Sequence, residues 1–217
     1  RDWAAEAIKR GVIRYFGFST HRNMPECLKA AAKTDWIDVI MTSYNFRYFE
    51  DSEMQEAVEA CKKAGIGLVA MKTQAYKAKE EKPEDMQKFM DSGYTAGQAK
   101  IKGVLEDSRF CTACVGRGSI EHLNLNIAAV MDKTRLSSTE KQAMKQYAKD
   151  TCYGYCLGCS NICGQAAPKT RGHLSDIMRA LMYEKNYAEP ETARKTFAKI
   201  PADVRRNLKH IDYREAE

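Results

Sequence analysis

No uninterrupted apolar run in the sequence approaches the roughly 20 residues that a membrane-spanning helix requires. The chain opens Arg-Asp-Trp, and its first residues show no signal-peptide pattern. These two absences predict a cytoplasmic protein with no membrane partner, and leave open an export signal upstream of Arg1. A chain of 217 residues with 44% apolar and 29% charged residues is typical of a globular protein of one large or two small domains.

The sequence also has no dense basic patch, although its net charge is +6. Residues 132–217 hold most of the excess, with 16 Lys and Arg against 11 Asp and Glu. Because these charges are dispersed and mixed in sign, we expect no nucleic-acid partner. They are either ordinary solvated helix faces or cations that lower the cost of holding an anionic group.

Cysteine is unevenly placed in the chain. Four of the eight cysteines fall within twelve residues, at Cys152, Cys156, Cys159 and Cys163, with no Cys-Pro pair and no cysteine after Cys163. Two thiolates separated by two residues can turn back onto one metal ion or cluster, and the glycines at 154 and 158 permit a tight turn. This density predicts metal or cluster ligation.

The cysteine segment has four interpretations. A zinc site usually joins two separated Cys-x-x-Cys knuckles, and a disulfide-stapled loop needs an oxidising compartment. Cys152-x3-Cys156-x2-Cys159 has the spacing of radical S-adenosylmethionine enzymes, but it follows all the strand candidates instead of preceding them. An iron–sulfur cluster on Cys156-x2-Cys159-x3-Cys163 fits best, with a fourth ligand at Cys152 or beyond Glu217.

Short apolar runs alternate with helical patterns through the first 132 residues. The runs lie at 13–19, 37–41, 66–71 and 110–115, and the apolar stripes between and after them include Met24–Ala31, Met54–Ala64 and Ile120–Val130. This alternation predicts four parallel βα units, and the near-continuous apolarity predicts strands that are buried on both faces.

From Lys133 onward the pattern is helical only. Ser137-Ser-Thr-Glu140 predicts a capping box, and shorter helices are expected to begin at Pro190 and Pro201. We therefore expect a domain boundary near residues 132–136.

Several segments together carry a family resemblance. Gly11-Val-Ile-Arg-Tyr-Phe-Gly-Phe-Ser19 resembles the fifth strand of aldo/keto reductases. Further landmarks of that family follow in matching order: Asp38 to Asn45, Gly65 to Met71, Thr95-Ala-Gly-Gln-Ala and Gly116 to Asn126. The segment Gly-Tyr-Cys-x-Gly-Cys-x-x-x-Cys resembles the subgroup that carries a C-terminal ferredoxin-type domain.

The resemblance implies an α/β fold: the C-terminal half of a (β/α)8 TIM barrel over residues 1–132, then a small all-α 4Fe-4S domain over 133–217. It implies Cys156, Cys159 and Cys163 as three cluster ligands, with Cys152 a bystander or substitute for a fourth ligand after Glu217. The family's catalytic Asp, Tyr, Lys and His come from the first half of the barrel. We therefore expect a fragment that contains no catalytic residue.

The resemblance also assigns cofactor contacts. Ser19 would bond the nicotinamide carboxamide of NAD(P)H, and Gly116, Ser119 and Asn126 would hold its adenine end. Ser119 is equally well explained as a plain helix N-cap. Met41 stands where the family has a glutamine, which favours a flavin as the alternative cofactor.

Other polar residues near the expected strand ends have two interpretations each. Lys72 would pair with a cofactor phosphate or be a solvated lysine, and His21 is a polar contact or a structural histidine. Cys111-x-x-Cys114 looks like a redox motif, but on a regular strand that spacing places the two thiols on opposite faces.

Two functions from different classes follow. The first is an aldo/keto reductase-type oxidoreductase acting on a small-molecule carbonyl substrate, whose cluster relays electrons with a redox partner protein or stabilises the tail. The second is a non-catalytic ferredoxin-like electron carrier, or a scaffold stabilised by a cluster or by zinc.

Overall fold

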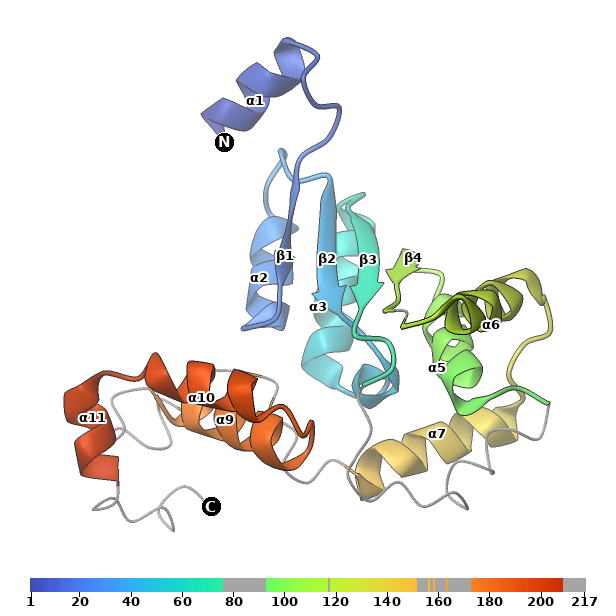
Figure 1. Cartoon of the computed structure of the whole chain (residues 1–217). Coiled ribbons are helices and arrows are strands. Elements are labelled where there is room, and N and C mark those ends of the chain that lie inside the picture. The colour runs from blue at the N-terminus through green and yellow to red at the C-terminus, as the bar shows by residue number, and fades with distance from the viewer. Residues whose placement is uncertain are drawn as a thin grey trace. The chain divides into compact units, whose positions relative to one another are not determined.

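The computed structural model describes residues 1–75, 93–116, 118–151 and 173–208, together with Cys156, Gly158 and Cys163 (Figure 1). These residues divide into two compact units. The first contains Arg1–Thr20, Met24–Ala75 and the described residues between 93 and 151. The second contains His21–Asn23 and the described residues from Cys156 onward.

The first unit is built on a parallel sheet of four strands in the order β1-β2-β3-β4. The strands are β1 (Gly17–Thr20), β2 (Val39–Ser43), β3 (Gly67–Met71) and β4 (Phe110–Cys114). Helix α1 (Asp2–Lys9) precedes them, and α2 (Met24–Ala31), α3 (Ser52–Lys63), α5 (Ala96–Leu105) and α6 (Ile120–Met131) follow one strand each. The four predicted βα units are confirmed.

Local sequence signals explain where these helices begin and end. Asp51 caps α3 by accepting a hydrogen bond from the Met54 amide at 2.9 Å, and Gly65 ends that turn with a φ of 76°. Thr95 and Gln98 form a capping box at the start of α5. The predicted capping box at Ser137 and Glu140 is also present, at the start of α7 (Ser138–Asp150).

The two faces of the sheet differ in burial. Figure 1 shows α2 and α3 together on one side of the sheet, and Ile40 and Leu68 are fully buried. Met41, Val69 and Met71, which alternate with buried residues, are only half-buried. The prediction that both faces are buried is therefore wrong for the described residues. A continuous apolar run marks two faces that can be covered, and only tertiary packing covers them.

Helix α6 departs from expectation in the same way. Its predicted apolar stripe is largely exposed: Ile120 is 78% accessible, Ile127 50% and Val130 48%. Of this helix, only Ala129 is buried. The helix is present as predicted, but the face predicted to be core packs against little of the described chain.

Helix α7 belongs to the first unit. Met144 and Tyr147 from α7 pack with Phe46 of the short helix η1 (Phe46–Tyr48), and Leu136, Ala75, Tyr94 and Ala99 join the same core cluster. Lys102, 4% exposed, donates to the carbonyls of Asp132 and Thr134 at 2.8 and 2.7 Å. The unit thus reaches Thr151, past the expected boundary at residue 132, because these contacts tie α7 to α5.

The described helices of the second unit are α9 (Leu174–Lys185), α10 (Pro190–Ala198) and α11 (Ala202–Asn207). Pro190 occupies the first turn of α10, and Pro201 precedes α11 as its N-cap residue. Ile200, Val204 and Leu208 form a small core with Ile177. No helix in the described part of the chain is long and apolar enough to cross a membrane.

Candidate cofactor site at the carboxyl ends of the strands

The parallel strands bring their carboxyl ends to one edge of the sheet, where ligands of α/β barrels bind. On β1, Ser19 is exposed and lies in register with Met41 of β2, which lies in register with Val69 of β3. The residue beside Ser19 is therefore Met41, a flexible thioether, at the position where the family resemblance leads us to expect a glutamine. This row offers one hydroxyl and an apolar surface to a ligand.

The rim after β3 has an unusual backbone that Asn45 holds. Lys72 has a φ of +57°, a left-handed conformation that is rare for residues other than glycine. The fully buried Asn45 donates from Nδ2 to the Lys72 carbonyl at 3.1 Å, and the Ala75 amide donates to the same oxygen at 3.0 Å. Asn45 therefore shapes the rim from which the exposed Lys72 projects, a role that local sequence does not reveal.

The segment after β4 groups three of the predicted cofactor residues. Gly116 is exposed, with open space around the position of a Cβ. Ser119 is the N-cap of α6 and accepts a hydrogen bond from the His122 amide at 3.2 Å, while Asn126 is half-buried on the same helix. The N-cap interpretation of Ser119 is thus confirmed, and the positive end of the α6 dipole lies beside it.

The structure keeps Ser19 apart from these three residues. β1 and β4 are the two edges of the sheet, so three strand spacings, about 14 Å in a flat sheet, separate them. The two sets can therefore serve only the opposite ends of one extended ligand. This arrangement matches their predicted roles at the nicotinamide and adenine ends of NAD(P)H, which stay predictions.

Cys111 and Cys114 lie at a β-bulge. The register passes from Leu68 opposite Phe110 to Val69 opposite Thr112, so Cys111 is an extra residue in β4. Both thiols are exposed. Because side chains do not alternate regularly across a bulge, the prediction that the two thiols lie on opposite faces stays a prediction.

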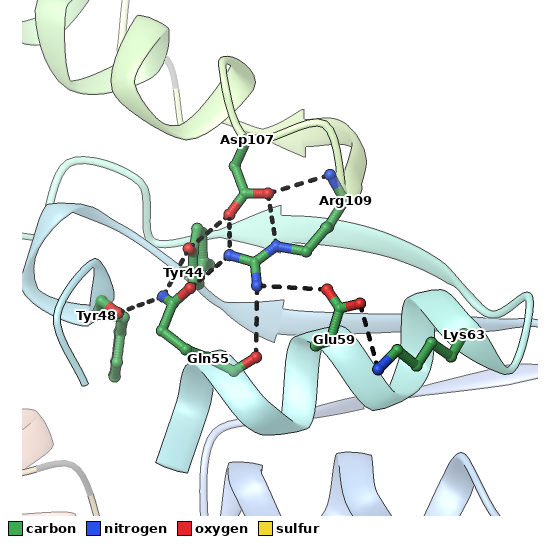
Figure 2. A network of polar contacts seen from close by, with 7 residues as sticks. All are labelled: Tyr44, Tyr48, Gln55, Glu59, Lys63, Asp107 and Arg109. Atoms are coloured by element: carbon green, nitrogen blue, oxygen red, sulfur yellow. Dashed lines mark hydrogen bonds and ion pairs between the residues drawn. The ribbon is translucent and has the colours of Figure 1, made fainter. Parts of the chain in front are cut away.

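A polar network beside the sheet was not expected from the sequence (Figure 2). The buried Tyr44 donates from Oη to Asp107 at 2.7 Å, and the guanidinium of Arg109 makes two hydrogen bonds to the same carboxylate at 2.8 and 2.7 Å. Gln55 links Tyr44 to Arg109, donating to the former at 3.0 Å and accepting from the latter. No local pattern signals this network, because Tyr44 and Asp107 are 63 positions apart.

The protonation states of the network suit a structural role. Burial raises the pKa of Tyr44 well above its usual value. Burial alone would also raise the pKa of Asp107, but hydrogen bonds from Arg109 and Tyr44 outweigh it and hold that pKa below its usual range. The hydrogen bond with Asp107 raises the pKa of Arg109. A tyrosine that resists ionisation is a poor proton donor to substrate, so we do not assign Tyr44 to catalysis.

The cysteine segment contacts helix α9 at Cys156. The Cys156 amide lies 3.2 Å from the Met182 sulfur, and its Sγ lies 3.7 Å from the Ser175 carbonyl. Cys163 is half-buried, and Cys152 and Cys159 lie outside the described residues. Within the part of the chain that is described, no group of three His, Cys, Asp or Glu side chains could hold a metal ion.

Four parallel βα units with polar residues at their carboxyl ends define a TIM-barrel-like α/β protein. A sequence model of the aldo/keto reductase family matches residues 3–149. The chain therefore belongs to the aldo/keto reductase family, which is a family of oxidoreductases.

Solved structures show the same fold. The chain is 24% identical to a thermostable aldo-keto reductase, Tm1743, in complex with the inhibitor epalrestat, with a TM-score of 0.52 over 65% of this chain and 51% of that one. It is 18% identical to an aldo-keto reductase from Klebsiella pneumoniae in complex with NADPH, with a TM-score of 0.53 over 67% and 51%. It is 16% identical to the aldo-keto reductase AKR2E5 complexed with NADPH, with a TM-score of 0.50 over 66% of this chain and 45% of that one. The chain thus spans about half the length of these structures. No curated protein matches it significantly.

Proposed function

We propose that the described βα units form the cofactor-binding half of an NAD(P)-linked oxidoreductase that interconverts a carbonyl compound and an alcohol. The observation that carries the proposal is the family match over residues 3–149, on a parallel sheet with Ser19 on β1 and with Gly116 and Ser119 between β4 and α6. Two structural relatives are described as complexes with NADPH, which supports the same cofactor here.

The roles follow from the two ends of the sheet. Ser19 would hydrogen-bond the carboxamide, and the α6 N-terminus with Ser119 and Asn126 would hold the adenine end with its phosphate. NAD(P)H supplies the hydride, and the protein's part is to orient the ring and exclude water. Tyr44 is buried and its hydroxyl already donates to Asp107, so we do not propose it as the proton donor.

NADPH binding to the 217-residue protein tests this proposal. Replacing Ser119 by Gly removes the hydroxyl but costs the helix cap only a few tenths of a kcal/mol. We expect the Kd for NADPH, measured by fluorescence titration, to rise about tenfold, the loss of one hydrogen bond to a charged group. Ser137→Gly, at the N-cap of α7, is the matched control and should leave the Kd unchanged. Equal Kd values for all three proteins would remove Ser119 from the site, and no binding by any of them would count against the cofactor half itself.

We further propose that Cys156, Cys159 and Cys163 are three ligands of a 4Fe-4S cluster. The described residues fit such a group in two respects. Cys156 and Cys163 are half-buried thiols, as a partly shielded cluster requires, and Gly158 has a φ of +78° that allows a sharp turn just before Cys159. A bound cluster supplies one-electron chemistry or stabilises the cysteine segment.

Iron and sulfide analysis of anaerobically prepared protein tests the cluster. We expect four iron atoms per chain, with visible absorption that dithionite bleaches. Cys156→Ala should abolish iron loading, whereas Cys152→Ala should retain it. A colourless protein that holds zinc would refute the cluster and favour the alternative of a zinc-stabilised scaffold. A cluster-loaded protein whose longer forms do not bind NADPH would favour the non-catalytic electron carrier.

A further inference from the structure

One face of α9 contacts Cys156. Ser175, Arg179 and Met182 follow each other at spacings of four and three, so they share a stripe of the helix. Ser175 and Met182 contact Cys156, at 3.7 and 3.2 Å. Arg179 lies between them in the stripe and is half-buried.

Arg179 packs directly on the backbone just after Cys156. A Cβ built on Gly158 would lie 2.6 Å from Nη1 of Arg179, closer than atoms can approach. The φ of +78° favours glycine at this position, and an added side chain would displace the guanidinium that lies against it. The guanidinium of Arg179 therefore lies against Gly158, which follows Cys156 by two residues in the sequence.

Among the described residues, the hydrogen-bond and ring partners of the Arg179 guanidinium are all neutral. Nη1 donates to the His21 carbonyl at 3.3 Å, Nη2 donates to the Tyr183 hydroxyl at 3.0 Å, and the guanidinium lies 5.7 Å from the Tyr183 ring centre. Asp176, one turn earlier on α9, is instead paired with Arg22 at 2.6 Å and with His173 at 3.1 Å. Among the described residues, then, no carboxylate balances Arg179, although a half-buried charge is costly without an opposite charge.

We propose that Arg179 is the counter-cation of an anionic, thiolate-ligated cluster at Cys156 and that it tunes the reduction potential of this site. The inference rests on the proposed cluster. Thiolate ligation makes the site anionic, and one added electron makes it more so, with no bond broken. A positive charge against Gly158, two residues after Cys156, stabilises both states, and the reduced state more. Arg179 is a positioning residue in this role, because it touches the ligand segment and not the substrate.

The measurement is the midpoint potential of the cluster, by dithionite titration of the full chain followed in the visible spectrum. Arg179→Gln should make reduction about tenfold less favourable, a shift of about −59 mV for one electron. Arg179→Lys retains the charge and should stay near the wild-type value. Arg194→Gln, which removes an exposed charge on α10, is the matched control and should change nothing.

The outcomes distinguish failure of the Arg179 proposal from failure of the cluster proposal on which it rests. A wild-type protein without iron would refute the cluster proposal itself. Iron loading in all variants with one common potential would refute the role of Arg179 alone, as would equal shifts in the Gln and Lys variants. Loss of iron in Arg179→Gln but not in Arg179→Lys would support it, because only charge separates those two variants. Gly158→Ala, which displaces the guanidinium, should reproduce the Gln variant.

Discussion

Two half-buried arginines of this chain stand in opposite electrostatic situations. Arg109, beside the sheet, is held by Asp107 through two hydrogen bonds, with side chains only 21% and 14% exposed (Figure 2). Arg179, beside the cysteine segment, has a carbonyl and a phenol as partners and no carboxylate among the described residues. The first arginine completes a closed structural network. Arg179 carries a charge that no acidic side chain among the described residues balances, which is typical of a binding site.

The largest effect is expected when the closed network is opened. Asp107→Ala removes the carboxylate that accepts from both the Arg109 guanidinium and the Tyr44 hydroxyl, and breaking one partner of such a pair costs about 3–5 kcal/mol. Urea unfolding followed by circular dichroism would measure it. Asp35→Asn is the control, because Arg1 and Asp35 are 66% and 79% exposed, and it should change stability little. A small loss for Asp107→Ala would mean that the network is not a unit.

A smaller effect is expected from pH. The folded pKa of Asp107 lies below its unfolded value of about 3.9, so its contribution is complete above that value and is lost as pH falls through the folded pKa. The loss should be smaller than for Asp107→Ala, since the protonated carboxyl still accepts hydrogen bonds. Unfolding measured between pH 6 and pH 3, roughly spanning that pKa, should show a steeper fall for wild type than for Asp107→Asn. Parallel curves would contradict the assignment.

The comparison itself is tested by matched changes at the two arginines. Arg109→Gln should destabilise the protein strongly, because it leaves Asp107 without its cation, whereas Arg179→Gln in the metal-free chain should cost less, about 1.5–3 kcal/mol, the value of hydrogen bonds that involve one charged group. Equal losses by urea unfolding would show that Arg179 is as structural as Arg109.

The smallest effect is expected on the exposed face of α6. Ile127 is 50% exposed, so Ile127→Gln should change the free energy of unfolding by no more than about 0.5 kcal/mol. Leu68→Ala in β3, a fully buried position, is the contrast and should cost about 2–5 kcal/mol. A large loss for Ile127→Gln would mean that this helix face is covered in solution.

Local signals in the sequence predicted the elements well but not their surroundings. The capping box at Ser137 and the four strands were predicted because propensity, capping and periodicity act within a few residues. β1 is shorter than the predicted run, since only Gly17–Thr20 pairs with a neighbour. The bulge at Cys111 could not be predicted, because it is defined by register with β3.

The cofactor contacts stay predictions. Ser19, Gly116, Ser119 and Asn126 were assigned by resemblance and by the rule that ligands bind at strand ends; the structure has Ser19 on β1, Gly116 and Ser119 after β4, and Asn126 within α6. Asn45, which holds the Lys72 carbonyl, and Arg179, which packs on Gly158, were not predicted. Each acts on a partner more than 20 positions away, beyond the range of any local pattern.

The sequence by itself therefore determined the order and type of the elements, the family, and the clustering of thiols between Cys152 and Cys163. These depend on short-range hydrogen bonding, on apolar periodicity and on covalent spacing. Only the tertiary structure decided which sheet face is covered, against which elements α7 packs, and which of the two arginines has an acidic partner. Burial and charge pairing depend on distances in space between residues that are remote in the chain, and no single segment of the sequence contains those distances.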